Sequence, residues 1–108
     1  MEPFLAVMKR HRTDRFLFSH AVDGYSLALD FKHTDRRHAE LVALCHRMNE
    51  LVLAAGGRFY FAKDSTLRPS DVQTFLGEDT LNRYRARKTE WDPDGILTSG
   101  LAERVGLV

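Results

Sequence analysis

Apolar and polar residues alternate most regularly over residues 25–31. Every second residue there is large and apolar, and Ser26, Ala28 and Asp30 occupy the positions between them. Successive side chains of a strand point to opposite faces. The segment therefore predicts a strand with one large apolar face and one small, polar face.

Two further segments have the composition of strands. Residues 15–20 are rich in aromatic residues, and the turn residues 22–24 that follow predict a hairpin with residues 25–31. Residues 58–62 predict a third strand, with Phe59 and Phe61 on one face and Tyr60 on the other.

Helical spacing dominates the rest of the chain. Apolar residues recur at intervals of three and four between Asp35, a candidate cap, and Gly56-Gly57, which predicts one long helix. This apolar stripe consists of Leu41, Leu44, Cys45, Met48, Leu51, Val52 and Ala55. Shorter helices are predicted over residues 2–12, 69–76 and 78 to about 88, followed by a type I turn over residues 92–95.

This order, α-β-β-α-β followed by short C-terminal helices, predicts an α+β fold. It matches a ferredoxin-like antiparallel sheet without its first strand, with the helices on the large apolar face. In a complete sheet of that kind the missing strand is an inner one, so its absence leaves an unpaired edge, and unpaired edges pair with other chains. We therefore expect either a homodimer through the sheet edge or face, or a separate partner polypeptide.

The composition narrows the class of protein. A chain of 108 residues is expected to form a single domain over residues 1–108, and a net charge of +1 gives no reason to expect a nucleic-acid partner. No apolar run is long enough to span a membrane, and the N-terminus has no signal-peptide pattern, so a cytoplasmic location is expected. The histidines and the lone cysteine show no metal-ligand spacing, so no metal site is expected.

Candidate chemistry is confined to the small, polar face. Ser26, Asp30 and Tyr60 share it, and Lys63 follows just beyond the third predicted strand. A lysine beside an aspartate binds a hydroxyl-rich substrate or an anion. The alternative is a solvent-exposed sheet face with a surface salt bridge, and periodicity alone favours this alternative over a binding site.

Three strings of residues resemble a known family. They are Gly-Tyr-Ser-Leu-Ala-Leu-Asp-Phe over residues 24–31, Ala-Ala-Gly-Gly-Arg-Phe-Tyr-Phe-Ala-Lys-Asp-Ser over residues 54–65, and Trp-Asp-Pro-Asp-Gly-Ile-Leu-Thr-Ser over residues 91–99. The chain resembles the C-terminal substrate (cap) domain of FAD-linked oxidases of the vanillyl-alcohol-oxidase type. It is most similar to the decaprenylphosphoryl-ribose oxidases, with the aldonolactone oxidases as wider relatives.

The resemblance implies a site and a cofactor. Lys63 and Asp30 would be the catalytic pair, with Asp30 orienting Lys63, and Tyr60, Ser26 and Lys63 would bind substrate. FAD would belong to a domain that this chain lacks, so the chain is expected to be inactive alone and to need a separate FAD-binding polypeptide.

Ser26 stands where the decaprenylphosphoryl-ribose oxidases tend to have asparagine, and Ala28 where they have cysteine. The substrate class therefore stays broad: a sugar alcohol, a lactone or a polyprenyl-phosphoryl sugar. The alternative is a self-standing dimeric α+β module that binds a ligand or a partner without catalysis.

Overall fold

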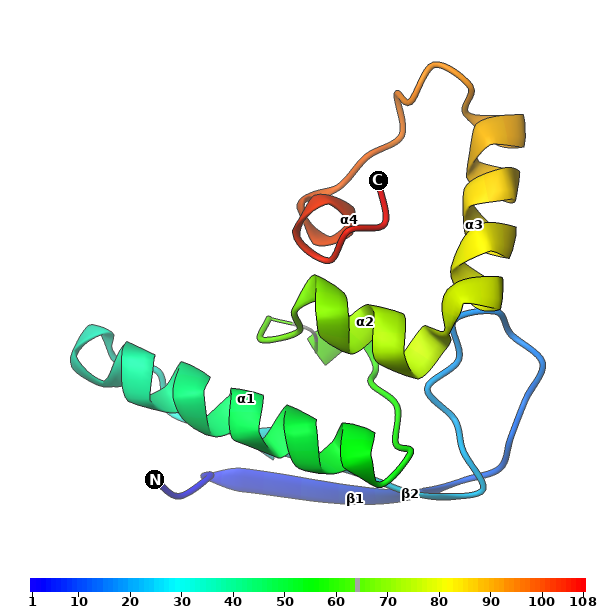
Figure 1. The fold of residues 1–108 in the computed structure, drawn as a ribbon. Helices are drawn as coiled ribbons and strands as arrows, with labels where there is room; N and C mark the ends of the chain where they lie inside the picture. Colours follow the sequence, from blue (N-terminus) through cyan, green and yellow to red (C-terminus); the bar gives the residue numbers. More distant parts are fainter. Residues whose placement is uncertain (64) are drawn as a thin grey trace.

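The computed structural model describes residues 1–63 and 65–108, and the described chain combines an antiparallel strand pair with helices (Figure 1). The α+β class predicted from the sequence is confirmed. In chain order the elements are β1 (Leu5–His11), β2 (Gly24–Asp30), the 3-10 turn η1 (Asp35–Arg37), α1 (His38–Ala54), the 3-10 turn η2 (Phe61–Lys63), α2 (Pro69–Leu76), α3 (Glu78–Trp91) and α4 (Gly100–Arg104).

The hairpin uses a different first strand from the one predicted. β1 pairs with β2 from Leu5 opposite Asp30 to His11 opposite Gly24, so the helix predicted over residues 2–12 is wrong. A short apolar run fits the helical and the strand period equally well, and pairing with β2 decides between them.

Residues 15–20 lie in the connection between β1 and β2, so the strand predicted there is wrong. The Asp14 carboxylate accepts hydrogen bonds from the Phe16 amide at 2.9 Å and the Ser19 hydroxyl at 2.7 Å. The Ser19 amide donates to the Phe16 carbonyl at 3.2 Å. Such local bonds from aspartate and serine side chains compete with strand pairing.

The third predicted strand is also wrong, because residues 61–63 form η2 and the Lys63 amide donates to the Tyr60 carbonyl at 2.9 Å. The predicted alternation nevertheless holds. The rings of Phe59 and Phe61 lie 5.5 and 5.7 Å from the ring of Phe75, whereas Tyr60 is exposed. The order of elements is therefore β-β-α followed by helices, and the incomplete ferredoxin-like order α-β-β-α-β is incorrect.

The long predicted helix is confirmed as α1, and its end follows the glycine signal. Gly56 has a positive φ of 71°, and its amide donates to the Leu53 carbonyl at 2.9 Å. The Gly57 amide donates to the Val52 carbonyl at 2.8 Å, and a Cβ at Gly57 would lie 2.5 Å from a methyl carbon of Val52. Asp35 does not cap α1, because it lies in η1 and its side chain makes no capping bond.

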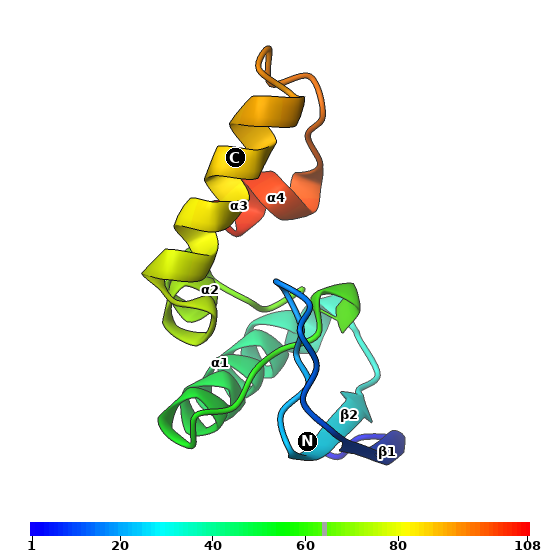
Figure 2. The same cartoon turned by 90° about the vertical axis from the view of Figure 1, so that its right-hand side faces the viewer.

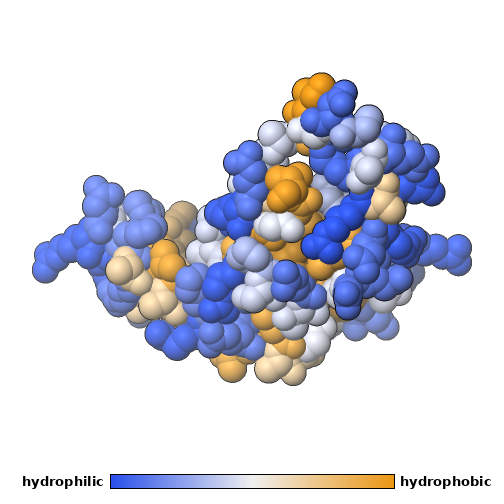
Figure 3. Space-filling view, turned by 45° about the horizontal axis from the view of Figure 1, so that its top comes forward, coloured by the Kyte–Doolittle hydropathy of each residue, from blue (hydrophilic) through white to orange (hydrophobic). Residues whose placement is uncertain are grey.

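The hydrophobic core lies entirely in the second half of the chain. Its buried members are Leu67, Val72, Phe75, Leu76, Leu81, Ala102, Val105 and Leu107. They come from α2, α3, α4 and the segments beside them, which Figure 2 shows stacked away from the hairpin, while α1 runs alongside it. Outside this core, apolar side chains also reach the surface at several places on the face shown in Figure 3.

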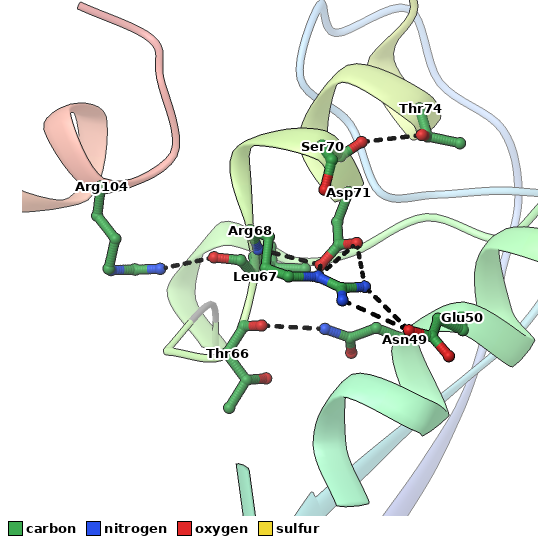
Figure 4. A network of polar contacts seen from close by, with 9 residues as sticks. All are labelled: Asn49, Glu50, Thr66, Leu67, Arg68, Ser70, Asp71, Thr74 and Arg104. Atoms are coloured by element: carbon green, nitrogen blue, oxygen red, sulfur yellow. Dashed lines mark hydrogen bonds and ion pairs between the residues drawn. The ribbon is translucent and has the colours of Figure 1, made fainter. Parts of the chain in front are cut away.

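A polar network joins α1, α2 and α4 (Figure 4). The Arg68 guanidinium pairs with the Asp71 carboxylate at 2.8 Å and reaches Glu50 on α1 at 3.4 Å. The Asn49 amide donates to the Thr66 carbonyl at 3.2 Å. Arg104 on α4 donates to the carbonyl of Leu67 at 3.1 Å. Burial raises the pKa of Asp71, but the hydrogen bonds from Arg68 outweigh it and hold that pKa below the ordinary value.

The hairpin turns its polar face inward, which is the reverse of the prediction. Tyr25 and Leu27 are 69% and 56% exposed, whereas Ser26, Ala28 and Asp30 are half-buried. The C-terminal helices supply their own apolar core. The hairpin reaches the helical part through the Asp30–Lys63 ion pair on its smaller face and through the ring of Phe18, in the connection between β1 and β2, which lies against Phe61 and Tyr84. The expectation that helices cover its large apolar face is therefore wrong.

The predicted turn over residues 92–95 is confirmed, and its first residue organises it. The Gly95 amide donates to the Asp92 carbonyl at 3.1 Å. The Asp92 carboxylate is buried, pairs with Lys88 on α3, and accepts the amides of Ile96 at 2.8 Å and Leu97 at 2.9 Å. These bonds, that from Lys88 foremost, lower the pKa of Asp92.

We expect Asp92→Ala to lower the free energy of unfolding by about 1–3 kcal/mol, because two amides and a lysine lose their acceptor. Urea denaturation measures this, and the matched control is Asp94→Ala, which removes an exposed carboxylate from the same turn.

A lowered pKa adds stability above the ordinary aspartate value of about 3.9, and that stability is lost as the pH falls through the folded value. Between about pH 5 and about pH 3 the wild type should therefore lose more stability than Asp92→Ala. Equal losses of unfolding free energy in Asp92→Ala and Asp94→Ala would contradict this account. So would curves of stability against pH that run parallel for the wild type and Asp92→Ala.

Candidate functional site

The residues predicted to carry chemistry converge at the end of β2. The Lys63 ammonium lies 2.8 Å from the Asp30 carboxylate, although the two residues are far apart in the sequence. The side chains of Lys63 and Asp30 are 54% and 36% exposed, so the pair is open to solvent. The structure thus brings together the two residues predicted as a catalytic pair.

Each partner of this ion pair is held by its own backbone. Asp30 is the last residue of β2, and its carbonyl accepts the Phe4 amide at 2.9 Å. Lys63 ends η2, which begins at Phe61, and the rings of Phe59 and Phe61 pack on Phe75. This packing anchors the backbone of the turn that carries Lys63, and the ion pair with Asp30 directs its side chain.

Tyr60 and Ser26 do not contact the ion pair and bind other partners. Tyr60 begins the turn that ends at Lys63, and its ring stacks on His20 with the centroids 4.7 Å apart. Ser26 is hydrogen-bonded to His11 at 2.7 Å and lies four residues from Asp30, which is about 13 Å along a strand. The four predicted residues line one side of the hairpin, but only Lys63 and Asp30 are in contact.

Two histidines complete this surface, and the sequence did not identify them. The rings of His11 and His20 meet edge to face at 5.0 Å, so contacts run from Ser26 through His11 and His20 to Tyr60. Both histidines fall in segments predicted with the wrong secondary structure, so no periodicity could place them together. Burial, and then the nearby His11, lower the pKa of His20.

Surface hollows lie elsewhere on the molecule. Two shallow ones run between α3 and the C-terminal residues, lined in part by Arg85, Lys88 and Thr89, and neither includes the Lys63–Asp30 pair. An open ion pair outside a cavity needs a covering surface before it can exclude water from a bound ligand.

Within residues 1–63 and 65–108, no group of three or more histidine, cysteine, aspartate or glutamate side chains is placed to hold a metal ion. In the same residues, no helix has the length and apolar character needed to cross a membrane. Asp64, which belongs to the string that resembles the oxidase family, lies outside the described residues.

Comparison with known proteins finds similarity over part of the chain. No family model matches the chain. The chain is similar to a protein of Streptomyces coelicolor described as "Uncharacterized protein in mprA 5'region", with 36% identity over 84 residues. The match covers 78% of this chain but 22% of that protein, so the chain spans about a fifth of the length of its curated relative.

We expect Lys63→Met to change the free energy of unfolding by less than about 1 kcal/mol, because exposed ion pairs contribute little to stability. Phe75→Ala is the contrasting variant, and it should cost about 3–5 kcal/mol, because three neighbouring side chains pack on that buried ring. Urea denaturation of both proteins tests this. A large decrease in the free energy of unfolding of Lys63→Met would show that the ion pair serves the stability of the fold and is not a binding site.

We expect His20 to titrate below the ordinary histidine pKa of about 6.5, because the folded protein disfavours its charged form. The stability it contributes is then complete above pH 6.5 or so and decreases as the pH falls toward the folded pKa. Proton NMR of the histidine rings measures the pKa, and urea midpoints at about pH 7.5 and about pH 5.5 measure the stability.

His20→Gln should weaken this pH dependence, whereas His38→Gln, which removes an exposed histidine from the start of α1, should leave it unchanged. A normal pKa for His20 would contradict the proposed burial effect.

Proposed function

We propose that the chain is the substrate-domain portion of an FAD-dependent oxidoreductase that acts on a sugar alcohol, a lactone or a polyprenyl-phosphoryl sugar. The observation that carries the proposal is the Lys63–Asp30 ion pair at the exposed end of β2, with Tyr60 in the same turn as Lys63. The resemblance to the oxidase family predicts that Lys63 and Asp30, which lie far apart in the sequence, act together. An open ammonium held by a carboxylate also suits a hydroxyl or an anionic group.

In this proposal Lys63 directs its remaining N–H groups to a substrate oxygen. Asp30 fixes the direction of the Lys63 side chain by accepting a hydrogen bond from its ammonium at 2.8 Å. Tyr60 offers a phenol from the same turn, and Ser26 a hydroxyl farther along β2. FAD would supply the hydride chemistry, and the protein would bind and orient the substrate.

The residues of this chain do not fit FAD by themselves. A flavin dinucleotide needs free backbone amides for its phosphates, usually in a glycine-rich turn between a strand and a helix. Gly56 and Gly57 follow a helix, and their amides already donate to the Leu53 and Val52 carbonyls. The flavin therefore belongs, in this proposal, to a separate polypeptide or domain.

The relative from Streptomyces coelicolor is much longer than the segment that it shares with this chain. The segment similar to this chain makes up 22% of that protein, which leaves most of its length for a further domain. We propose that such a domain is the flavin-binding part and that this chain needs an equivalent partner.

The competing function is a self-standing dimeric module that binds a ligand or a partner without catalysis. The exposed apolar face of the hairpin favours it, because Tyr25 and Leu27 lie open to solvent.

We expect the purified chain to be colourless and to bind FAD no more tightly than about 100 μM in a fluorescence titration, since it offers few contacts to the ring and none to the phosphates. The Streptomyces coelicolor relative should purify with bound flavin. A chimera in which the matched 84 residues come from this chain should keep the flavin and reduce a dye acceptor with sugar alcohols or aldonolactones.

In that chimera Lys63→Ala should lower kcat/KM by at least about 10-fold, a loss of about 1.4 kcal/mol of transition-state stabilisation. The matched control is Lys32→Ala, which removes an exposed lysine two residues after β2. A colourless relative, micromolar FAD binding by the isolated chain, or equal activity in the two lysine variants would each overturn the proposal.

A further inference from the structure

The outer edge of β2 is unpaired. β1 and β2 form a two-stranded sheet, and among the described residues no backbone hydrogen bond joins β2 to a segment other than β1 and the adjacent Phe4. An unpaired strand edge presents a row of amides and carbonyls that accepts a further strand.

The two edges of the sheet differ in charge. β1 ends in Lys9, Arg10 and His11, and lysine or arginine on an edge strand discourages pairing. β2 has the sequence Gly-Tyr-Ser-Leu-Ala-Leu-Asp, so its one charged residue is Asp30, already paired with Lys63. Of the two edges, that of β2 is therefore the one suited to a partner strand.

The sequence of β2 is compatible with antiparallel pairing to itself. With Leu27 on the two-fold axis, Leu27 faces its own copy, Tyr25 faces Leu29, Ser26 faces Ala28 and Gly24 faces Asp30. No like charges then lie opposite one another. The pairs of Tyr25 with Leu29 and of Leu27 with Leu27 are apolar, and such cross-strand pairs stabilise sheets.

The accessible surface of the chain is larger than that of an average folded monomer of the same mass, and a partner strand would cover part of it. Its accessible area is 7963 Å², whereas a folded monomer of 12.4 kDa exposes about 6,100 Å². Its radius of gyration of 15.3 Å likewise exceeds the roughly 13 Å expected for a compact chain of this length. A standard interface buries about 800 Å² from each partner, which is less than this excess. Part of the excess is the exposed hairpin face, where Phe4, Met8, Tyr25 and Leu27 are between 56% and 73% exposed.

We propose that a second copy of this chain pairs with the first along β2, in the antiparallel register centred on Leu27, to give a continuous sheet β1-β2-β2-β1. The occupant of the β2 edge is thus the chain itself. This inference does not depend on the proposed oxidoreductase function, since it requires neither a substrate nor a flavin, and in the proposed register Asp30 faces Gly24 and not another charge.

The first test is the mass of the purified chain by sedimentation equilibrium between about 1 and about 200 μM, which spans the affinities expected for an interface of this size. A dimer is expected, and Leu27→Lys should weaken it at least about 100-fold, because it places two ammonium groups opposite each other on the axis.

The matched control is Met8→Lys, which makes a comparable apolar-to-lysine change at the residue opposite Leu27 on β1, on the same exposed face. In the proposed dimer the two copies of Met8 are separated by three strand spacings, about 14 Å, so the dimer should persist.

A second test keeps its value if Leu27→Lys fails to fold. In a Cys45→Ser background, Leu27→Cys should form a disulfide-linked dimer under mild oxidation, because residues directly opposite in antiparallel strands have Cα atoms about 4.5–5.5 Å apart. Met8→Cys should not.

A chain that stays monomeric throughout this range overturns the proposal. So does a dimer that survives Leu27→Lys, or one that Met8→Lys disrupts equally, since the face and not the edge would then hold it. Lys63→Ala should leave the dimer intact, so failure of the flavin experiments and failure of this proposal are separate results.

Discussion

The ring of Phe75 holds the segment that follows α1 against the helical core. It belongs to the core around α2, and the rings of Phe59 and Phe61 and, at 5.6 Å, the guanidinium of Arg58 lie against it. Arg58 in turn donates to the Ser19 carbonyl at 2.7 Å, in the connection between β1 and β2. The ring of Phe18, in the same connection, lies 5.6 Å from that of Phe61 and 4.8 Å from that of Tyr84 on α3. The position of the hairpin relative to the helices therefore depends on the aromatic contacts around Phe75 and on the Arg58 hydrogen bond.

The side chains that position Lys63 differ from those that are free to contact a ligand. The Lys63–Asp30 pair is too exposed to contribute much stability, but the half-buried rings of Phe59 and Phe61, close to Lys63 in the chain, pack against the core. The ammonium therefore extends from a turn that is anchored by aromatic packing, and it remains accessible. An exposed ammonium on an anchored turn is suited to contact a ligand or a second polypeptide that binds at this surface.

The sequence predicted best those elements whose signals are local. The start of α2 at Pro69, the break at Gly77 and the end of α1 before Gly56 follow from the backbone preferences of single residues. The three errors, over residues 2–12, 15–20 and 58–62, are short segments in which tertiary contacts or side-chain bonds decide the conformation. The pairing of Lys63 with Asp30 was foreseen, whereas the contacts among Ser26, His11, His20 and Tyr60 were not, because they depend on which strand is the partner of β2.

The placement of the core in the second half of the chain also has a consequence for biosynthesis. β1, β2 and α1 leave the ribosome before Phe75 and the helices that surround it, so the hairpin has no aromatic surface on which to dock while it is nascent. Exposed apolar strands of this kind are aggregation-prone in partly synthesised chains. Until α2 has been synthesised, the exposed apolar side chains of β1 and β2 are therefore open to such association.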